Sequence, residues 1–177
     1  MHITIAVNGF QHEVWNKQYF PDDLPDEWRF GYYANEFDAL LIDSPLQQAS
    51  DISPVYDMMQ EADDKFIFAF CDELPVELTK DLTCGVVQVS FPLESKDVVI
   101  GDIKLEQANI LFQQNMSETV CVLRATSDCL VGNEQLKQLL MYIYANYAQF
   151  VRVCLFFGRY LQDVQTISNA KVINDLL

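Results

Sequence analysis

The stretch ALLIDSPLQQASDISPVYDMMQEADDKFIFAFC, residues 39–71, decides the fold class of this chain. Ala39–Ile42 is an apolar run that ends at Asp43-Ser44-Pro45, and Phe66–Cys71 is a second apolar run of strand length. Between them, Ser53-Pro54 places a capping side chain before a proline, which predicts a helix to about residue 62. Strand, helix and strand in this order predict parallel strands joined by a crossover helix.

The residues before this stretch extend the same pattern. Ile3–Val7 is a short apolar run that ends at the turn signal Asn8-Gly9. Pro25-Asp26-Glu27 predicts a helix start, because proline suits the first turn and acidic side chains suit the positive end of the helix dipole. The chain therefore opens as strand, helix, strand, helix, strand.

The middle of the chain breaks this rhythm. Four strand-like runs follow one another: Gly85–Phe91, Val98–Leu105, Asn109–Gln113 and Thr119–Ala125. A parallel crossover needs about a dozen residues of its own, and the linkers 92–97 and 114–118 are shorter. We therefore expect antiparallel hairpins or a meander in this section.

The α/β pattern returns at the end of the chain. Gly132-Asn133-Glu134 predicts the start of a helix to about Tyr147, and Val151–Phe157 predicts a strand buried on both faces. Ile167–Leu177 is expected to close the chain as a helix. We predict a single α/β domain over residues 1–177.

The net charge of −15 is concentrated in one half of the chain. Residues 1–82 carry 17 acidic against four basic side chains, whereas residues 83–177 carry nine against seven. An anionic surface repels nucleic-acid phosphates and anionic membranes. No apolar run reaches the roughly 18 residues of a membrane helix, and the start of the chain has no basic leader with a cleavage site. We expect a cytoplasmic protein without a nucleic-acid or membrane partner.

The residues that usually bind metals or form disulfides lack the spacing that those sites need. The five cysteines are an odd number without paired spacing, so we expect buried, reduced thiols. His12-Glu13 is followed by asparagine at position 16, where a zinc-protease motif needs histidine. The acidic run Asp22–Glu27 lacks the glycine of a calcium loop. No phosphate-binding or dinucleotide motif is present, and we expect no metal and no cofactor.

A series of short motifs runs through both ends of the chain. They are Asn8-Gly9-Phe10, Trp15, Tyr19-Phe20-Pro21, Leu24-Pro25, Tyr32-Tyr33-Ala34, Leu41-Ile42-Asp43, Val122-Leu123-Arg124, Val153–Phe157 and Asn169-Ala170. Their order resembles that of the domain of unknown function 72 (DUF72, YecE-like) family. The resemblance implies an uncharacterised protein with a TIM-barrel-like (β/α) architecture, here shortened, with an antiparallel section in the middle. Leu41 stands where the family has a glutamate, so a catalytic role of that glutamate would be lost here.

Sites in parallel α/β proteins form at the carboxyl ends of the strands. The candidate catalytic residues at these ends are Asp43, Asp72 and Arg124, and the candidate substrate-binding residues are Asn8, Trp15, Gln88 and Arg159. The two arginines could clamp an anionic substrate while an aspartate moves a proton, or they could pair with the aspartates as a structural network. In either case, we expect Arg124 to lie in this region within ion-pair reach of a strand-end carboxylate, because an unpaired charge there would be costly.

Two functions are compatible with these residues. The first is a non-catalytic or degenerate binding or assembly protein, and the second is a hydrolase- or isomerase-like enzyme acting on a small anionic molecule. An enzyme should show a pocket with the candidate side chains converging. A non-catalytic protein should show the strand ends plugged by Phe10, Trp15 or Phe157.

The strand region 85–125 also predicts a homodimer. Without crossover helices, one apolar face of this region would lack a cover within the chain: Val86, Val98, Ile100, Ile110, Phe112, Val120 and Val122. A two-fold related copy is the commonest cover for such a face. The alternative is a monomer in which the helices of the chain cover the sheet.

Overall fold

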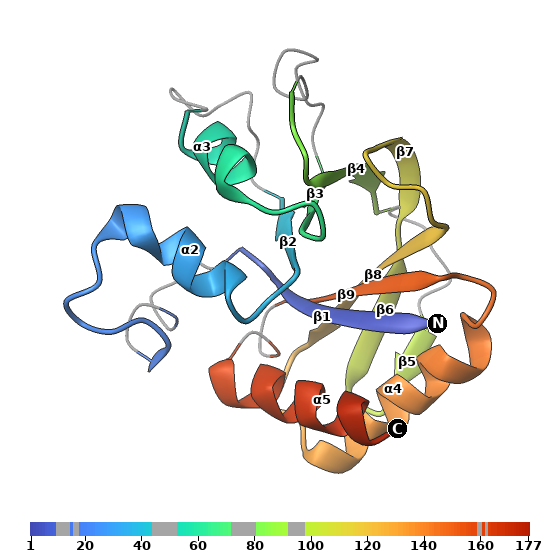
Figure 1. The fold of residues 1–177 in the computed structure, drawn as a ribbon. Helices are drawn as coiled ribbons and strands as arrows, with labels where there is room; N and C mark the ends of the chain where they lie inside the picture. The colour runs from blue at the N-terminus through green and yellow to red at the C-terminus, as the bar shows by residue number, and fades with distance from the viewer. Residues whose placement is uncertain are drawn as a thin grey trace.

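Six parallel strands form the centre of a curled sheet in the computed structural model, in the order β8-β9-β1-β2-β3-β4 (Figure 1). The structure describes residues 1–9, 15, 18–43, 53–71, 81–91, 98–158, 161 and 163–177. The parallel strands are β1 (His2–Asn8), β2 (Ala39–Ile42), β3 (Ile67–Phe70), β4 (Gly85–Ser90), β8 (Val120–Ser127) and β9 (Arg152–Phe157). The predicted strand–helix–strand order at both ends of the chain is confirmed.

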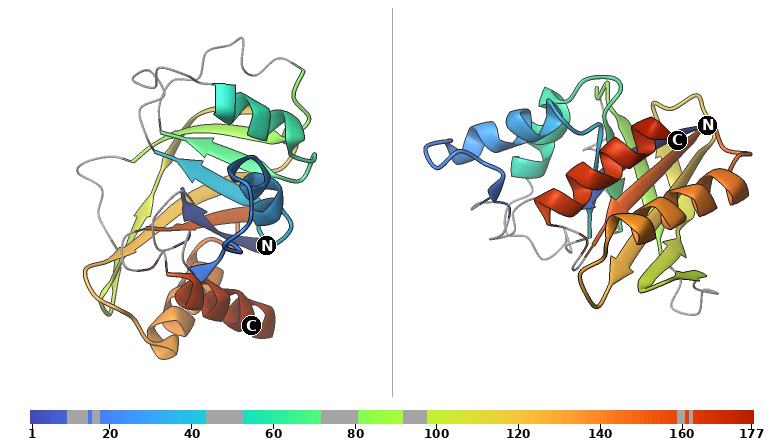
Figure 2. Two further views of the ribbon diagram at one scale, coloured as in Figure 1. Left: turned by 90° about the vertical axis from the view of Figure 1, so that its left-hand side faces the viewer. Right: turned by 90° about the horizontal axis from the view of Figure 1, so that it is seen from below.

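Helices cover the outer, convex side of this sheet. They are the 3-10 helix η1 (Asp26–Trp28), α2 (Arg29–Ala34), α3 (Ser53–Glu61), α4 (Asn133–Asn146) and α5 (Val164–Leu176). Figure 2 shows α4 and α5 side by side, and Asn169 Nδ2 donates to Asn133 Oδ1 at 2.9 Å between them. Helix α5 begins earlier than predicted, because Asp163 caps it by accepting from the Thr166 amide. None of the helices among the described residues has the length and apolar character that a membrane crossing requires.

Three antiparallel strands complete the sheet: β5 (Val98–Ile100), β6 (Ile103–Gln107) and β7 (Asn109–Gln114). The predicted single strand Val98–Leu105 is wrong, because Gly101 at a φ of 59° turns the chain and makes β5 and β6 a hairpin. Strand β6 pairs with β8 and β7 pairs with β4, and only Ala108 separates β6 from β7. This bent segment therefore connects the two ends of the parallel section, and the sheet curls back toward itself.

We call this curled sheet the half-barrel. Its outer face packs Ile3, Ile5 and Val7 of β1 against the helices. Its inner face carries a second buried cluster, in which alanine and valine side chains such as Ala6 and Val122 lie beside the larger Leu41, Ile67 and Phe156. The mixed α/β class and the antiparallel middle section are thus confirmed, in the form of a curled, barrel-like sheet.

Candidate functional site: the mouth of the half-barrel

The carboxyl ends of the parallel strands surround one end of the half-barrel, which we call the mouth. A cavity of about 230 Å³ lies there. It is lined by Asn8, Asp43, Lys104, Glu106, Arg124, Thr126 and Gly158. The lining thus combines two cationic side chains with two carboxylates.

On one side of the mouth, the ends of β1 and β2 bring Asn8 and Asp43 together. Asn8 is the last residue of β1 and pairs with Leu41 of β2, and Asp43 follows the end of β2. The parallel register thereby places both polar side chains at the same edge of the sheet. Asn8 Nδ2 donates a hydrogen bond of 2.5 Å to Asp43 Oδ2. One carboxylate oxygen of Asp43 is thus occupied by an amide of the chain itself.

On the other side, Arg124 of β8 lies opposite Glu106 in the antiparallel ladder with β6. Arg124 Nε donates to Glu106 Oε2 at 2.7 Å, and Lys104 Nζ lies 3.0 Å from Glu106 Oε1. The Arg124 and Glu106 side chains are only 23% and 12% exposed. Solvent therefore screens this ion pair less than it screens a surface pair.

Arg124 also contacts the far side of the half-barrel. Its guanidinium carbon lies 4.0 Å from the centroid of the Phe91 ring. Phe91 follows β4 and packs with the inner face of the sheet, five strands from β8 in the sheet order. On the inner face, the direct ladder neighbour of Arg124 is the buried Phe156 of β9, and Ala6 of β1 follows at the same level.

The charges of the mouth keep Glu106 ionised. Burial raises the pKa of Glu106, but hydrogen bonds from Arg124 and Lys104 lower it more, so the pKa lies below its ordinary value of 4.5. A carboxylate with a lowered pKa accepts hydrogen bonds well and exchanges protons poorly near neutral pH. Glu106 is thus suited to holding the two cations in place.

Three of the seven predicted site residues meet at the mouth: Asn8, Asp43 and Arg124. Trp15 is instead fully buried on the outer side, where its ring packs 5.8 Å from that of Phe37. Gln88 occupies an outward-facing position of β4, because its neighbours Val87 and Val89 face inward.

Two further predicted site residues, Asp72 and Arg159, and the predicted plug residue Phe10 lie outside the described residues. Phe157 belongs to the outer core, as Trp15 does. Neither of these two aromatic side chains plugs the mouth. A cavity that brings Asp43 and Arg124 together is present, and both side chains already have partners within the chain.

Arg124 does form an ion pair in the mouth, but with Glu106 of β6 and not with Asp43 as the sequence suggested. Glu106, Lys104 and Phe91 were missed. The alternation Ile103-Lys104-Leu105-Glu106 is a signal that puts both charges on one face of a strand. The sequence alone does not indicate which strand pairs with the strand that carries Lys104 and Glu106. The pairing of β6 with β8 supplies that information.

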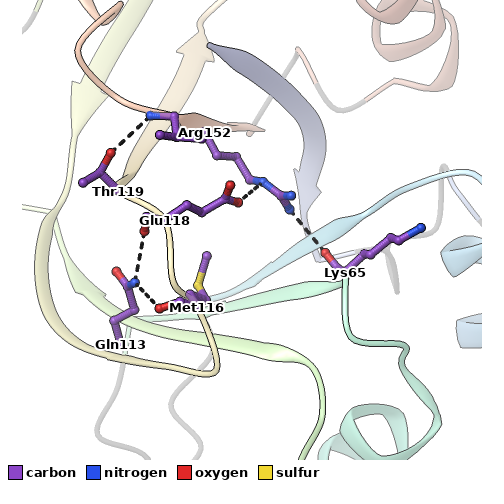
Figure 3. Close-up of polar contacts among 7 residues, drawn as sticks. Lys65, Gln113, Met116, Glu118, Thr119 and Arg152 are labelled. Carbon is purple, nitrogen blue, oxygen red and sulfur yellow. Dashed lines mark hydrogen bonds and ion pairs between the residues drawn. The ribbon is translucent and has the colours of Figure 1, made fainter.

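The opposite end of the half-barrel, which we call the floor, is crossed by polar contacts (Figure 3). Arg152 Nε lies 2.6 Å from Glu118 Oε1, and Arg152 Nη1 donates to the Lys65 carbonyl at 3.3 Å. Gln113 Nε2 donates to the carbonyls of Met116 and Glu118 in the turn between β7 and β8. These contacts tie the start of β9 to that turn and to the segment before β3. A cavity of about 220 Å³ beside them is lined by Asp64, Lys65, Ile67, Gly85, Asn115, Met116, Ser117, Glu118 and Arg152.

The described residues contain no cluster of three or more histidine, cysteine, aspartate or glutamate side chains that could hold a metal ion. All five cysteines are free. Cys84, Cys121 and Cys154 are buried, and burial raises the pKa of their thiols to about 11, 12 and 12. These three thiols are consequently poor nucleophiles.

Comparison with known proteins identifies the fold. No protein-family profile matches the chain, and no curated protein matches it. The structure is similar to the crystal structure of a DUF72 family protein from Thermotoga maritima, with a TM-score of 0.62 over 99% of each chain and 9% sequence identity. The resemblance predicted from the sequence motifs is therefore confirmed, and at this identity it concerns the fold.

Proposed function

We propose that this protein is a divergent relative of the DUF72 proteins, with a shortened TIM-barrel-like architecture, that binds a small polar molecule in the mouth without converting it. The observation that carries this proposal is that charged side chains of the mouth already form hydrogen bonds or ion pairs within the chain. Asp43 is bonded to Asn8, and Glu106 is shared by Arg124 and Lys104. A site built in this way is preorganised for binding, because its side chains are held before a ligand arrives.

The same pairing argues against general acid–base catalysis at Glu106. A catalytic acid or base works best when its pKa is near the operating pH. Two cationic neighbours move the pKa of Glu106 in the other direction, below 4.5. Arg124, in turn, is fixed between Glu106 and the Phe91 ring.

The test is an NMR titration of the isotopically labelled protein with glucose, glycine, acetate and inorganic phosphate as separate probes. We expect at least one probe to shift the amide signals of Asn8, Asp43 and Arg124 in a saturable manner. Asp43→Asn should weaken that binding, whereas Glu118→Gln, at the floor, should not. Binding of no probe at the mouth, or equal binding by Asp43→Asn, would contradict the proposal.

An enzyme remains the second candidate, because Asp43 and Arg124 line one cavity. In this alternative, Arg124 would hold a small anionic substrate and Asp43 would move a proton, as in hydrolases and isomerases. The two functions differ in the fate of the ligand. NMR spectra of a bound probe, recorded over a day, should show it unchanged if the protein only binds. Conversion that Asp43→Asn abolishes while binding persists would establish the enzyme.

A homodimer through the 85–125 region is part of the same proposal. Among the predicted contact residues, Val86, Val120 and Val122 are buried within the chain itself. Strand β7 remains exposed, with Ile110 at 38%, Leu111 at 60% and Phe112 at 42%, and residues 107–117 carry no charge. An uncharged apolar strand is where two copies of a −15 chain repel each other least.

Sedimentation equilibrium at micromolar concentration tests the dimer. We expect a mass of twice 20.4 kDa for the natural chain and a monomer for Leu111→Asp. Val172→Asp serves as the matched control, because Val172 is an equally exposed apolar residue on α5. A natural chain that stays at the monomer mass over the whole concentration range would refute the dimer.

A further inference from the structure

We infer that the ligand of the mouth is a small zwitterion of the amino-acid class, with its carboxylate on Arg124 and its ammonium group beside Asp43. This inference rests on the proposed binding function and names its ligand. It depends on which hydrogen-bonding atoms of the mouth are used within the chain and which are not.

Arg124 offers two unused donors. Its Nε nitrogen donates to Glu106, and one face of the guanidinium lies on the Phe91 ring. Its terminal Nη nitrogens donate to no atom of the described residues, and the side chain lines the cavity. Two adjacent N–H donors in a fixed plane match the two oxygens of a carboxylate. Glu106 and Phe91 hold this fork in one orientation, which reduces the entropy lost on binding.

Asp43 offers an unused acceptor on the other side of the mouth. Its Oδ2 atom accepts from Asn8, and Oδ1 accepts no hydrogen bond from the described residues. No lysine or arginine of the described part of the chain forms an ion pair with Asp43. An ammonium group therefore finds a carboxylate there without competition from those cations.

The order of the strands keeps these two unused groups apart. Strands β9 and β1 lie between β8, which carries Arg124, and β2, which precedes Asp43. Neighbouring strands are separated by about 4.8 Å. The long Arg124 side chain covers part of the distance between β8 and Asp43. The geometry points to one ligand whose positive and negative groups reach opposite sides of the mouth.

The charge balance and the size of the cavity also favour a zwitterion. A purely anionic ligand would meet Asp43, Glu106 and the field of a −15 chain, and a purely cationic ligand would meet Lys104 and Arg124. A zwitterion pairs with one group of each sign. The cavity of about 230 Å³ is smaller than the roughly 300–1,000 Å³ of drug-sized sites, so the ligand has few heavy atoms.

Calorimetric titration with glycine, β-alanine and 4-aminobutyrate, a series in which the distance between the charges increases, tests the inference. Acetate and methylammonium each present one half of the zwitterion. We expect one member of the series to bind at least tenfold more tightly than either half. Arg124→Met and Asp43→Asn should each reduce that binding at least tenfold, and Glu118→Gln should leave it unchanged. Amide spectra of each variant verify that it folds. If Arg124→Met does not fold, Arg124→Lys is used in its place.

The possible outcomes separate the ligand class from the binding function. Acetate binding as tightly as every zwitterion, or zwitterion binding that survives Asp43→Asn, overturns the inference. If glucose or phosphate saturates the mouth while no zwitterion binds, the inference fails and the proposed binding function stands. If no compound of any class saturates the mouth, both fail.

Discussion

Arg124 and Phe91 meet across the concave side of the half-barrel, with 4.0 Å between the guanidinium carbon and the ring centroid. Arg124 belongs to β8 and Phe91 follows β4, the two ends of the parallel section. The contact therefore connects strands that share no ladder. Glu106 forms an ion pair with the same guanidinium. Arg124 thus connects the two ends of the parallel section and also lines the cavity.

The coupling between Arg124 and Phe91 is measurable by a double-mutant cycle. We expect Arg124→Met and Phe91→Leu to destabilise the protein together by less than the sum of their separate effects. The coupling free energy should be about 0.5–2 kcal/mol, the range of a partly desolvated cation–π contact. Urea unfolding of the four proteins gives the values. A coupling of zero would show that the two side chains act independently.

Stability should depend on pH through Glu106. Its pKa is lowered on folding, so its ionised form adds stability above the ordinary value of 4.5, and this stability is lost as the pH falls through the lower folded-state value. The difference in unfolding free energy between the natural chain and Glu106→Gln should thus be largest near pH 7 and should shrink below about pH 4.5. The control is Val172→Ala on α5, an exposed change that removes no ionisable group, and its difference should not follow this trend. A difference that stays constant from pH 7 to pH 3 would contradict the assignment.

Local sequence signals predicted Asn8 and Asp43 on one side of the mouth, and on the other side they predicted Arg124 but not its partner Glu106. Asn8 and Asp43 end neighbouring parallel strands, and the rule for such ends predicted that they would meet. Glu106 lies 18 residues before Arg124 on an antiparallel strand, and strand propensity does not reveal which strand it pairs with. Trp15 shows the same limit, since an aromatic residue in a loop can pack on a core or face a ligand. Its burial against Tyr33 and Phe37 depends on the position of α2.

The ion pair at the floor should contribute more to stability than an exposed pair of the same type. Glu118 and Arg152 are 2.6 Å apart, and their side chains are about one quarter exposed. Arg152 also donates to the Lys65 carbonyl. We expect Glu118→Gln to lower the unfolding free energy by about 1–2 kcal/mol. The matched control is Asp26→Asn, because the Asp26 side chain is 85% exposed in its ion pair with Arg29, and its loss should cost about 0.5 kcal/mol or less. Equal losses in urea unfolding would show that the floor contact is no stronger than a surface pair.

The thiols should react in an order set by burial. Cys129 is exposed, Cys71 is half-buried, and Cys84, Cys121 and Cys154 are buried. Because burial raises the pKa of the last three to about 11 or 12, few of them are thiolates at pH 8. A thiol reagent should label Cys129 first in the folded protein and count five thiols in denaturant without reductant. A count of three or fewer thiols in denaturant would reveal disulfides. In Cys129→Ser, the fastest phase of labelling of the folded protein should be lost, which would identify Cys129 as the thiol that reacts first.

The last prediction concerns Gly85 at the start of β4, where Met116 and Ile67 lie close to the position of a Cβ atom. A Cβ atom on Gly85 would lie 3.1 Å from Met116 Cγ, 3.2 Å from Met116 Sδ and 3.3 Å from Ile67 Cγ1. Ile67 is a fully buried strand residue and cannot retreat, whereas Met116 is flexible and belongs to the turn between β7 and β8.

Gly85→Ala should therefore displace Met116 and destabilise the protein by about 1–2 kcal/mol, as is usual for overpacking in a core. Adding Met116→Ala removes the two closest of the three crowding atoms, so the double variant should be more stable than the sum of the two single changes predicts. Gly132→Ala is the control, because its Cβ meets no atom within 4 Å. Urea unfolding gives the unfolding free energy of each variant. If Gly85→Ala acts by crowding Met116, its cost should fall in the Met116→Ala background. If it acts only on the unfolded chain, its cost should be the same in both backgrounds.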